Sequence, residues 1–167
     1  MKPLTVDLPY PTIDGIEKNT HLATVINPAY AGFHGEMTAI LQYVYHAFYF
    51  EKLGDGQTAK VLNSIAVAEM GHLDVLGSLI LQLGADPIFA VRTPFSYQFY
   101  NAATVTYSKT PQKMLLDDIS SELCAIEDYK SMLSVIDDEK VSAVIARIKL
   151  DEDLHVLALK ERLTAFS

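Results

Sequence analysis

A Glu-x-x-His motif occurs twice in this chain of 167 residues, once as Glu69 with His72 and again as Glu152 with His155. Residues three positions apart lie on the same face of an α-helix, one turn from each other. Each motif therefore directs a carboxylate and an imidazole toward one point, which is a geometry suited to a metal ion. One such pair arises easily by chance, whereas two copies in one chain require a structural reason.

The segments that precede the two motifs supply that reason. Glu36 is followed seven residues later by Tyr43, and Glu122 is followed seven residues later by Tyr129. The chain is thus an internal repeat of Glu-x6-Tyr, a connection, and Glu-x-x-His. We predict that four helices bring together six metal ligands, with one Glu from each of two helices and a Glu-x-x-His from each of the other two. These ligands are Glu36, Glu69, His72, Glu122, Glu152 and His155.

Helix-start and helix-stop signals divide the chain into an N-terminal arm and four helices. Residues 1–26 contain three prolines and are expected to pack on the bundle as an arm, with room for one or two helical turns between Glu17 and Ile26. Asn27-Pro28 is typical of an N-cap followed by proline at the first helical position, which predicts a first helix over about 28–53. Its expected inward stripe is Phe33, Glu36, Ile40, Tyr43, Ala47 and Phe50. The other three helices are predicted over about 57–83, 111–135 and 138–164.

The segment 84–110 lacks helical periodicity and contains six aromatic residues. A helix of about 25 residues is nearly 40 Å long, and a connection of this length can span that distance. We therefore predict that the segment crosses the bundle and leaves the second and third helices parallel. The expected fold class is all-α, a four-helix bundle with a long crossover between its second and third helices. Residues 1–167 are expected to form one domain.

Composition and charge limit the partners. The net charge of −8 argues against binding to nucleic acid or to an anionic membrane. The chain has neither a run of about twenty apolar residues nor an apolar N-terminal signal segment, so we expect a cytoplasmic protein without a membrane partner. The single cysteine, Cys124, excludes an intrachain disulfide and a site built from several thiolates. We expect it to be a small buried residue that points away from the metal ligands.

The ligand set indicates which metals it suits. Four buried carboxylates are costly without compensation, and two divalent ions supply a charge of about +4 that balances them. A set of carboxylates with two imidazoles and no sulfur suits Fe or Mn, and we predict two Fe ions or, alternatively, two Mn ions. Six protein ligands leave coordination positions open on two ions. A small oxidant, peroxide or oxygen, is therefore the expected substrate, and redox chemistry is favoured over a structural role.

Three further residues are candidates for contacts with the ligands. Tyr43 and Tyr129 lie two turns beyond their glutamates, so their phenols either hydrogen-bond ligating carboxylates or fill the core. Asp151 either accepts the free N–H of His72 across the bundle, which would fix the tautomer of that ring, or lies on the surface. Four other polar residues are read as structural: His21, His34, His46 and Glu51.

Four stretches of the sequence also carry a family resemblance: Tyr30-Ala31-Gly32, Glu36-Met37-Thr38-Ala39-Ile40, Ala68-Glu69-Met70-Gly71-His72-Leu73 and Gly84-Ala85-Asp86-Pro87. With the six ligand residues, they resemble a stand-alone rubrerythrin-like branch of the ferritin-like superfamily, with some similarity to manganese catalases. The resemblance covers nearly the full length of the chain. It implies a ferritin-like bundle with a dinuclear site that acts on oxygen or peroxide, or that oxidises Fe(II).

The chain departs from rubrerythrins at two places. Rubrerythrins carry a rubredoxin domain with four cysteines, which is missing here, so a peroxidase of this kind would need an external electron donor. They also carry an additional glutamate one turn after the ligand of the third helix, where this chain has Ala125, and Glu127 falls off the ligand face. The remaining six ligands are similar to those of bacterioferritin ferroxidase centres.

We therefore predict a dinuclear oxidoreductase that acts on peroxide or oxygen or oxidises Fe(II). The alternatives are a manganese catalase and an iron-storage or structural metal-binding bundle. We expect the chain to form a homodimer through apolar helix faces.

Overall fold

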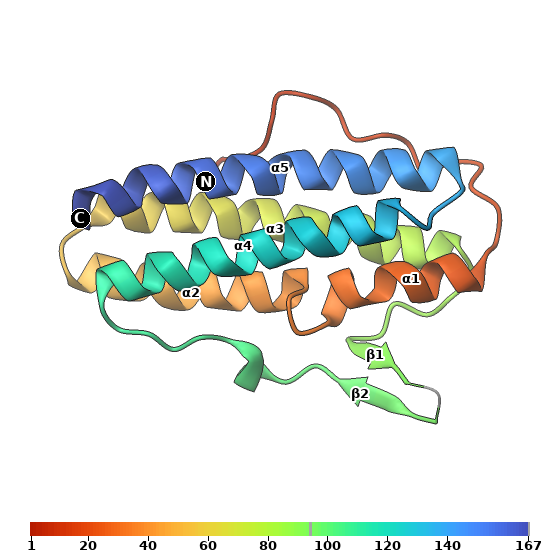
Figure 1. The fold of residues 1–167 in the computed structure, drawn as a ribbon, viewed down its shortest axis with the longest axis horizontal. Coiled ribbons are helices and arrows are strands. Elements are labelled where there is room, and N and C mark those ends of the chain that lie inside the picture. Colours follow the sequence, from red (N-terminus) through yellow and green to blue (C-terminus); the bar gives the residue numbers. More distant parts are fainter. Residues whose placement is uncertain (94, 167) are drawn as a thin grey trace.

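The bundle is built from long helical rods that lie side by side (Figure 1). The computed structural model describes residues 1–93 and 95–166. Its described α-helices are α1 (Thr20–Ala31), α2 (Glu36–Lys52), α3 (Gly56–Gln82), α4 (Pro111–Leu133) and α5 (Glu139–Leu163). Helices α1 and α2 lie end to end and together form the first of four rods (Figure 1). The predicted all-α four-helix bundle is confirmed, with its first rod broken.

The predicted start of the first helix is wrong. The helix begins at Thr20, where the Asn19 side chain accepts hydrogen bonds from the backbone N–H groups of His21 and Leu22. Pro28 lies inside α1, near its end. Because proline has no N–H, residue 28 cannot donate to the carbonyl of Thr24, and α1 ends three residues later, where Gly32 adopts an extended backbone (ψ −174°). The Asn27-Pro28 pair therefore marks the end of a helix, and the N-terminal arm is shorter than predicted.

A turn at residues 32–35 separates α1 from α2. The Gly32 N–H donates to the carbonyl of Pro28, and the N–H groups of Thr38 and Ala39 donate to the carbonyl of Gly35. A Cβ atom at Gly35 would lie 2.5 Å from the Ala29 carbonyl oxygen, so the turn is too tight for a side chain there. Phe33 belongs to this turn and is 62% exposed. Its predicted place on the buried stripe is therefore wrong, while the stripe from Glu36 to Phe50 is buried.

The predicted starts of the other helices agree with the structure to within a residue. The Asp55 carboxylate caps α3 by accepting from the Thr58 N–H, and the Asp138 carboxylate caps α5 by accepting from the Lys140 and Val141 N–H groups. Pro111 is the first residue of α4, where its missing N–H costs no hydrogen bond.

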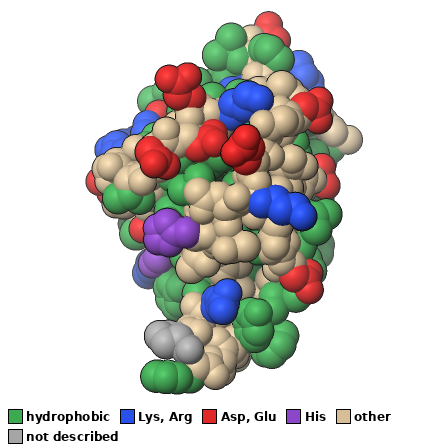
Figure 2. Space-filling view, turned by 90° about the vertical axis from the view of Figure 1, so that its right-hand side faces the viewer, with side chains coloured by type: hydrophobic (Ala, Val, Ile, Leu, Met, Phe, Trp, Pro, Cys, Tyr) green, Lys and Arg blue, Asp and Glu red, His purple; other side chains and the backbone are tan. Residues whose placement is uncertain are grey.

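The crossover between α3 and α4 contains more regular structure than predicted. A two-stranded antiparallel hairpin pairs β1 (Ala90–Arg92) with β2 (Tyr97–Phe99), and a short 3-10 helix, η1 (Ala102–Thr104), follows. The crossover runs the length of the bundle and leaves α3 and α4 parallel, as predicted (Figure 1). Phe95 is 99% exposed, and Figure 2 shows that hydrophobic groups reach the surface at the hairpin end, whereas charged groups gather over the helices.

Two apolar clusters fill the interior, one toward each end of the rods. The first joins α1 to the C-terminal half of α3 and to the facing ends of α4 and α5, with Ile26, Leu79 and Ile145 fully buried. The second joins α2 to the other ends of the helices, with Phe50, Leu62 and Leu159 fully buried. Burying each such side chain contributes about 1.5–3 kcal/mol. On each of the four rods, the predicted ligands lie between the two apolar clusters.

Among the described residues, α3 is the one helix long and apolar enough, by length and composition, to cross a membrane. Apolar core helices pass the same test. The buried stripe of α3 carries Glu69 and His72 and faces the other helices. The length and apolar character of α3 are thus those of a helix packed inside the bundle.

Candidate metal centre

The six predicted ligands converge midway along the bundle, and all six are buried. Glu36 opens α2 and Glu122 lies in α4, so these two glutamates face each other from neighbouring rods. The two Glu-x-x-His motifs lie in α3 and α5. Even the most exposed of the six, Glu36, has only 4% of its surface accessible. The helical repeat therefore places four carboxylates and two imidazoles in one buried layer.

Within this layer the ligand atoms form two overlapping groups of four. One consists of Glu36, Glu69, His72 and Glu152, and the other of Glu69, Glu122, Glu152 and His155; the ligand atoms within each group all lie within 4.8 Å of one another. Glu69 and Glu152 belong to both groups. They therefore have the position of bridging carboxylates, whereas Glu36 and Glu122 each belong to one group.

Both imidazoles present the same nitrogen to the carboxylates. The Nδ1 atom of His72 lies 2.7 Å from Glu69 Oε2 and 3.2 Å from Glu152 Oε1. The Nδ1 atom of His155 lies 3.0 Å from Glu69 Oε1 and 3.5 Å from Glu122 Oε1. The two rings are stacked, with centroids 5.9 Å apart and planes inclined by 28°. In both rings Nε2 points away from the four glutamates, so Nδ1 is the nitrogen available to a metal.

The electrostatics of the protein without a cation show why this layer suits metal ions. Burial, together with the charges of Glu69 and Glu152, raises the pKa of Glu36 well above its usual value. Burial also raises the pKa of Glu122, with the Glu152 charge adding to the effect. Burial disfavours the charged form of His72, but the adjacent Glu69 charge and the hydrogen bonds with Asp151, Glu152 and Glu36 together outweigh it and raise the pKa of that imidazole well above its usual value. The layer thus takes up protons where cations are lacking.

Several buried atoms in the layer also lack hydrogen bonds. Among the described residues, Glu69 Oε1, Glu152 Oε1 and His155 Nδ1 make no hydrogen bond of good geometry, although each lies within 3.0–3.2 Å of an ion-pair partner. An unsatisfied buried polar atom costs about 1–3 kcal/mol, more when charged. Two divalent cations would satisfy these atoms and balance four carboxylates, with both imidazoles neutral. The residues present therefore fit a dinuclear metal group.

Two buried tyrosines contact the glutamates that belong to one group each. The Tyr43 hydroxyl, from α2, donates to Oε1 of Glu122 in α4. The Tyr129 hydroxyl, from α4, donates to Oε1 of Glu36 in α2. Burial raises the pKa of both phenols well above the usual value, so they remain protonated donors. Each tyrosine therefore holds the glutamate of the other half of the repeat.

The outward nitrogens of the two histidines have different acceptors. His72 Nε2 lies 3.2 Å from Asp151 Oδ2, and His155 Nε2 lies 2.8 Å from the carbonyl oxygen of Leu4. Asp151 is fully buried, so of the two places considered for it the structure selects the one beside His72. Burial by itself would raise the pKa of Asp151, but hydrogen bonds, the largest with His72, lower that pKa to about 2. Asp151 is therefore an ionised acceptor.

Sequence reasoning missed three contributors beside the histidines. Tyr10 donates to Asp151 Oδ2 at 2.6 Å, and Arg147 NH1 lies 2.8 Å from the same oxygen. Arg147 is one turn before Asp151 on α5, a spacing that would have indicated the ion pair. Nothing in the sequence indicates the Leu4 carbonyl or Tyr10, because both act from the arm, which has no periodic pattern.

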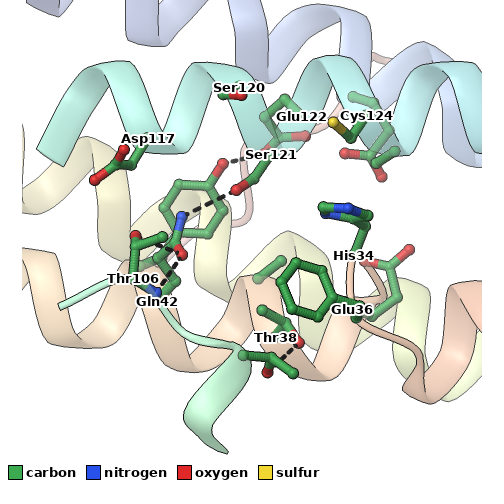
Figure 3. Close-up of a pocket in the computed structure, with 16 residues that line it drawn as sticks. His34, Glu36, Thr38, Gln42, Thr106, Asp117, Ser120, Ser121, Glu122 and Cys124 are labelled. Carbon is green, nitrogen blue, oxygen red and sulfur yellow. Dashed lines mark hydrogen bonds between the residues drawn. The ribbon is translucent and has the colours of Figure 1, made fainter. Parts of the chain in front are cut away.

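A cavity of about 170 Å³ lies between α2 and α4 and reaches Glu36, Glu122 and Glu152 (Figure 3). The crossover forms part of its wall: the Thr104 and Thr38 hydroxyls lie 3.0 Å apart, and the Thr106 N–H donates to Gln42 Oε1. The crossover therefore encloses the approach to the buried carboxylates. The remaining polar lining includes Ser120, Ser121, Asp117 and His34.

One expectation about a residue near this cavity needs correction, and a second residue, His34, also lies at its opening. Cys124 was expected to be buried and to point away from the ligands, but it is partly exposed and lines the cavity. It lies two positions after Glu122, where the open face of α4 meets the cavity. His34, read as structural, is exposed and lines the same opening because it belongs to the turn before α2.

The other polar residues lie outside the six-residue layer. His46 is fully buried, and its Nδ1 lies 2.8 Å from Asp118 Oδ1, which also accepts from Gln42 Nε2. This hydrogen bond is a contact between α2 and α4 that sequence reasoning did not find. His21 and Glu51 are exposed. Glu127 is exposed and pairs with Lys130, away from the ligands, as predicted.

Comparison with solved structures finds similar folds. The manganese catalase KatB from Anabaena superposes with a TM-score of 0.84 at 21% identity, covering 96% of this chain and 78% of that one. A bacterioferritin from Rhodobacter capsulatus, described with a metal-free dinuclear site and haem iron, superposes with a TM-score of 0.75 at 23% identity, covering 90% and 88%. At these identities the likeness concerns the fold.

Comparison with curated proteins finds no significant match. The sequence model of the ferritin-like domain, however, matches residues 32–159, which include all six predicted ligands and most of the bundle. The four-helix bundle with its long crossover agrees with that match. This chain is a member of the ferritin-like domain family.

Proposed function

We propose that this protein binds two metal ions at Glu36, Glu69, His72, Glu122, Glu152 and His155 and uses them for redox chemistry on a small oxidant. The observation that carries the proposal is the pair of overlapping ligand groups with two shared glutamates. Carboxylates shared in this way would help to hold both ions. A structural site would be closed by its ligands, whereas this layer adjoins a cavity.

The donor set favours iron, with manganese as the alternative. Four carboxylates and two imidazoles without sulfur suit either metal. When bound, such ions supply electrons to, or accept them from, a molecule held beside them. We propose a di-iron site that reduces peroxide or oxygen, or that oxidises Fe(II), in the manner that the rubrerythrin and bacterioferritin resemblance implies.

The chain's own residues select and position the substrate. A cavity of about 170 Å³ is smaller than the roughly 300–1,000 Å³ of pockets that hold drug-sized ligands, so its size favours a small oxidant. Its hydroxyl groups can hydrogen-bond a peroxide. Glu36 and Glu122 reach the cavity and are each held by one tyrosine. These phenols restrict the carboxylate rotamers and keep the ligand geometry fixed.

A second candidate function is that of a manganese catalase. Disproportionation of peroxide uses one peroxide as oxidant and another as reductant, so it needs no electron donor. The single cysteine of this chain cannot form the four-thiolate iron site that donates electrons within rubrerythrins. A peroxidase cycle would instead need an external electron donor, and iron storage would need a large closed shell of subunits.

We also propose that the protein is a cytoplasmic homodimer. The outer surface of the second rod exposes Met70 and Leu81, which lie with Phe89 around an open apolar depression. Pairing of such faces buries apolar side chains that would otherwise contact water. Measurement of the mass in solution tests this part separately.

Metal analysis of protein purified from its source identifies the ions and their number. Addition of Fe(II) to metal-free protein in air is expected to produce an oxo-bridged ferric absorption that Glu69→Ala lacks. Oxygen release from peroxide by the Mn(II)-loaded protein would instead support the catalase. Equal spectra for the wild type and Glu69→Ala, with no oxygen release, would contradict both redox proposals.

A further inference from the structure

Residues 4–10 lie beside α5, where they contact His155 directly and bind Asp151, the hydrogen-bond partner of His72. Leu4 makes the first contact. Its N–H donates to the Ser64 carbonyl of α3 at 3.0 Å, and its own carbonyl lies 2.8 Å from His155 Nε2. A carbonyl oxygen can only accept a hydrogen bond. Neutral His155 must therefore carry its proton on Nε2 and present the Nδ1 lone pair to Glu69.

The same segment holds the acceptor for the other histidine. Asp151 Oδ1 accepts from the Val6 N–H at 2.7 Å, and Asp151 Oδ2 accepts from the Tyr10 hydroxyl at 2.6 Å. These bonds hold the carboxylate of Asp151 so that Oδ2 lies 3.2 Å from His72 Nε2. His72 is thereby restricted to the corresponding tautomer, with Nδ1 free to bind a cation.

Arg147 fastens the segment to α5. Its Nε donates to the Leu8 carbonyl at 3.0 Å, and its NH2 donates to the Val6 and Leu8 carbonyls at 3.1 and 2.8 Å. The guanidinium carbon lies 4.3 Å from the centre of the Tyr10 ring. Arg147 is buried between the segment and α5, with only 5% of its surface exposed. One side chain thus joins the segment to the residue that orients His72.

The internal repeat explains why a separate segment is needed. Asp151 directly precedes Glu152, and the corresponding residue before Glu69 is Ala68, which has no acceptor to offer His155. Ala68 is 2% exposed, close to where the Leu4 backbone meets α3. The carbonyl of Leu4 takes the role that a second aspartate would have had. The N-terminal segment therefore completes the half of the repeat that lacks this residue.

We propose that residues 4–10 are part of the metal centre, where they fix both ligating imidazoles from outside the four helices and raise the affinity for the two ions. The proposal rests on the dinuclear site proposed above, but not on its reaction. Loss of a hydrogen-bond partner that orients a metal ligand typically costs about 10–100-fold in metal affinity. Residues 4–10 are therefore expected to influence metal binding although none of them is a ligand.

Two truncations of nearly equal length test the Leu4 contact. Removing residues 2–5 joins Met1 to Val6 and leaves no carbonyl for His155, whereas removing only residues 2–3 joins Met1 to Leu4 and retains it. We expect the longer truncation to lower the affinity for one of the two Zn²⁺ ions by about 10–100-fold, measured by competition with a chelator. We expect the shorter one to bind both ions as the wild type does.

Hydrogen exchange of the histidine ring protons gives a measurement that distinguishes loss of one hydrogen bond from general destabilisation of the fold. In Zn²⁺-loaded protein with ¹⁵N-labelled histidine, the wild type should show two slowly exchanging Nε2–H protons, from His72 and His155. The longer truncation should lose the His155 proton alone. Tyr10→Phe retains the aromatic ring over Arg147 and keeps the fold testable if the truncation unfolds. It should accelerate exchange of the His72 proton and leave that of His155 unchanged.

The inference would be overturned if the longer truncation bound two Zn²⁺ ions with wild-type affinity and kept both ring protons, and if exchange in Tyr10→Phe were unchanged. The proposed function would then remain intact. Failure of the wild type itself to bind Zn²⁺, Fe²⁺ or Mn²⁺ would overturn the dinuclear site. Zn²⁺ binding that depends on the segment, without any reaction of the iron form, would overturn only the proposed redox activity.

Discussion

The Tyr129 hydroxyl on α4 donates a hydrogen bond to the Glu36 carboxylate on α2. The reciprocal bond, from Tyr43 on α2 to Glu122 on α4, relates the same two helices in the opposite direction. The tyrosine of each Glu-x6-Tyr segment therefore donates its hydrogen bond to the glutamate of the other segment. The result is a pair of polar links between the helices that also border the cavity.

Replacing Tyr129 by Phe should weaken the ion held by Glu36. The substitution leaves a buried carboxylate oxygen without its donor, which we expect to lower the stability of the metal-free protein by about 1–3 kcal/mol. Metal titration should show that the affinity for one of the two ions is lower by about 10–100-fold. Tyr97→Phe, at an exposed position of the hairpin, is the control. Unchanged titration of both ions in Tyr129→Phe would show that the phenol only fills the core.

Replacing Glu152 by Ala should damage the site more than replacing Glu127 by Ala, although both are helical glutamates. Glu152 belongs to both ligand groups, so its loss leaves two divalent ions facing only three carboxylates. Metal content should fall, together with the thermal stabilisation that bound metal provides. Glu127 is exposed and pairs with Lys130, so its loss should change stability by less than about 0.5 kcal/mol. Elemental analysis that finds two ions in Glu152→Ala and fewer in Glu127→Ala would reverse the assignment.

The stability of the metal-free protein should fall as the pH rises above about 4.3, the usual pKa of glutamate in an unfolded chain. Burial raises the pKa of Glu36 and of Glu122, so in this window the folded state binds more protons than the unfolded state. The free energy of unfolding therefore decreases with pH until the pH passes the raised pKa values. Bound cations compensate these charges, and protons compete with them at low pH.

The difference in melting temperature between the metal-loaded and metal-free proteins should therefore grow from about pH 5 to about pH 8. Thermal unfolding followed by circular dichroism, with Mn²⁺ or with a chelator at each pH, measures this difference. A constant difference across the range would mean that these carboxylates do not change protonation when the chain unfolds.

Filling the cavity should slow the reaction without removing the ions. Ala125 lines the cavity one turn beyond Glu122, and a Phe there would occupy the approach to the carboxylates. We expect the rate of oxidation by peroxide or oxygen to fall by about tenfold or more, which is about 1.4 kcal/mol in the barrier. Leu123→Phe, at a neighbouring exposed position outside the cavity, should react at the wild-type rate. Equal rates in the two variants would place the substrate's route elsewhere.

The two glycines inside α3 should respond differently to alanine. A Cβ at Gly71 would meet nothing within 4 Å, so Gly71→Ala should stabilise the helix by about 1 kcal/mol. A Cβ at Gly77 would lie 3.2 Å from the Tyr30 ring, which stacks on Phe89. Gly77→Ala should therefore gain less or lose stability. Chemical denaturation of both variants tests the contrast, and a larger gain at Gly77 would contradict the close packing of Tyr30.

The architecture and the convergence of the six residues could be predicted because they depend on short-range periodicity. The i, i+3 spacing of Glu69 with His72 places both on one helix face whatever else the chain does. The repeat then indicates which faces meet. The assignment of all six as metal ligands stays a prediction that the geometry supports.

What could not be predicted depends on contacts between distant segments. The Leu4 carbonyl reaches His155 from the other end of the chain, and a backbone carbonyl leaves no mark on the sequence. The break after Pro28 was missed because Asn-Pro suits the start of a helix as well as the approach to its end. The pair of His46 with Asp118 joins two helices at positions that no local spacing relates.

The interruption of the first rod makes the two halves of the repeat mechanically unequal. Glu36 is the first residue of α2 and follows directly on the turn at residues 32–35, whereas Glu69, Glu122 and Glu152 are anchored by helix on both sides. A shift of this turn would move one ligand of one ion and leave the other ion undisturbed. The turn at residues 32–35 can therefore affect one of the two proposed metal positions separately from the other.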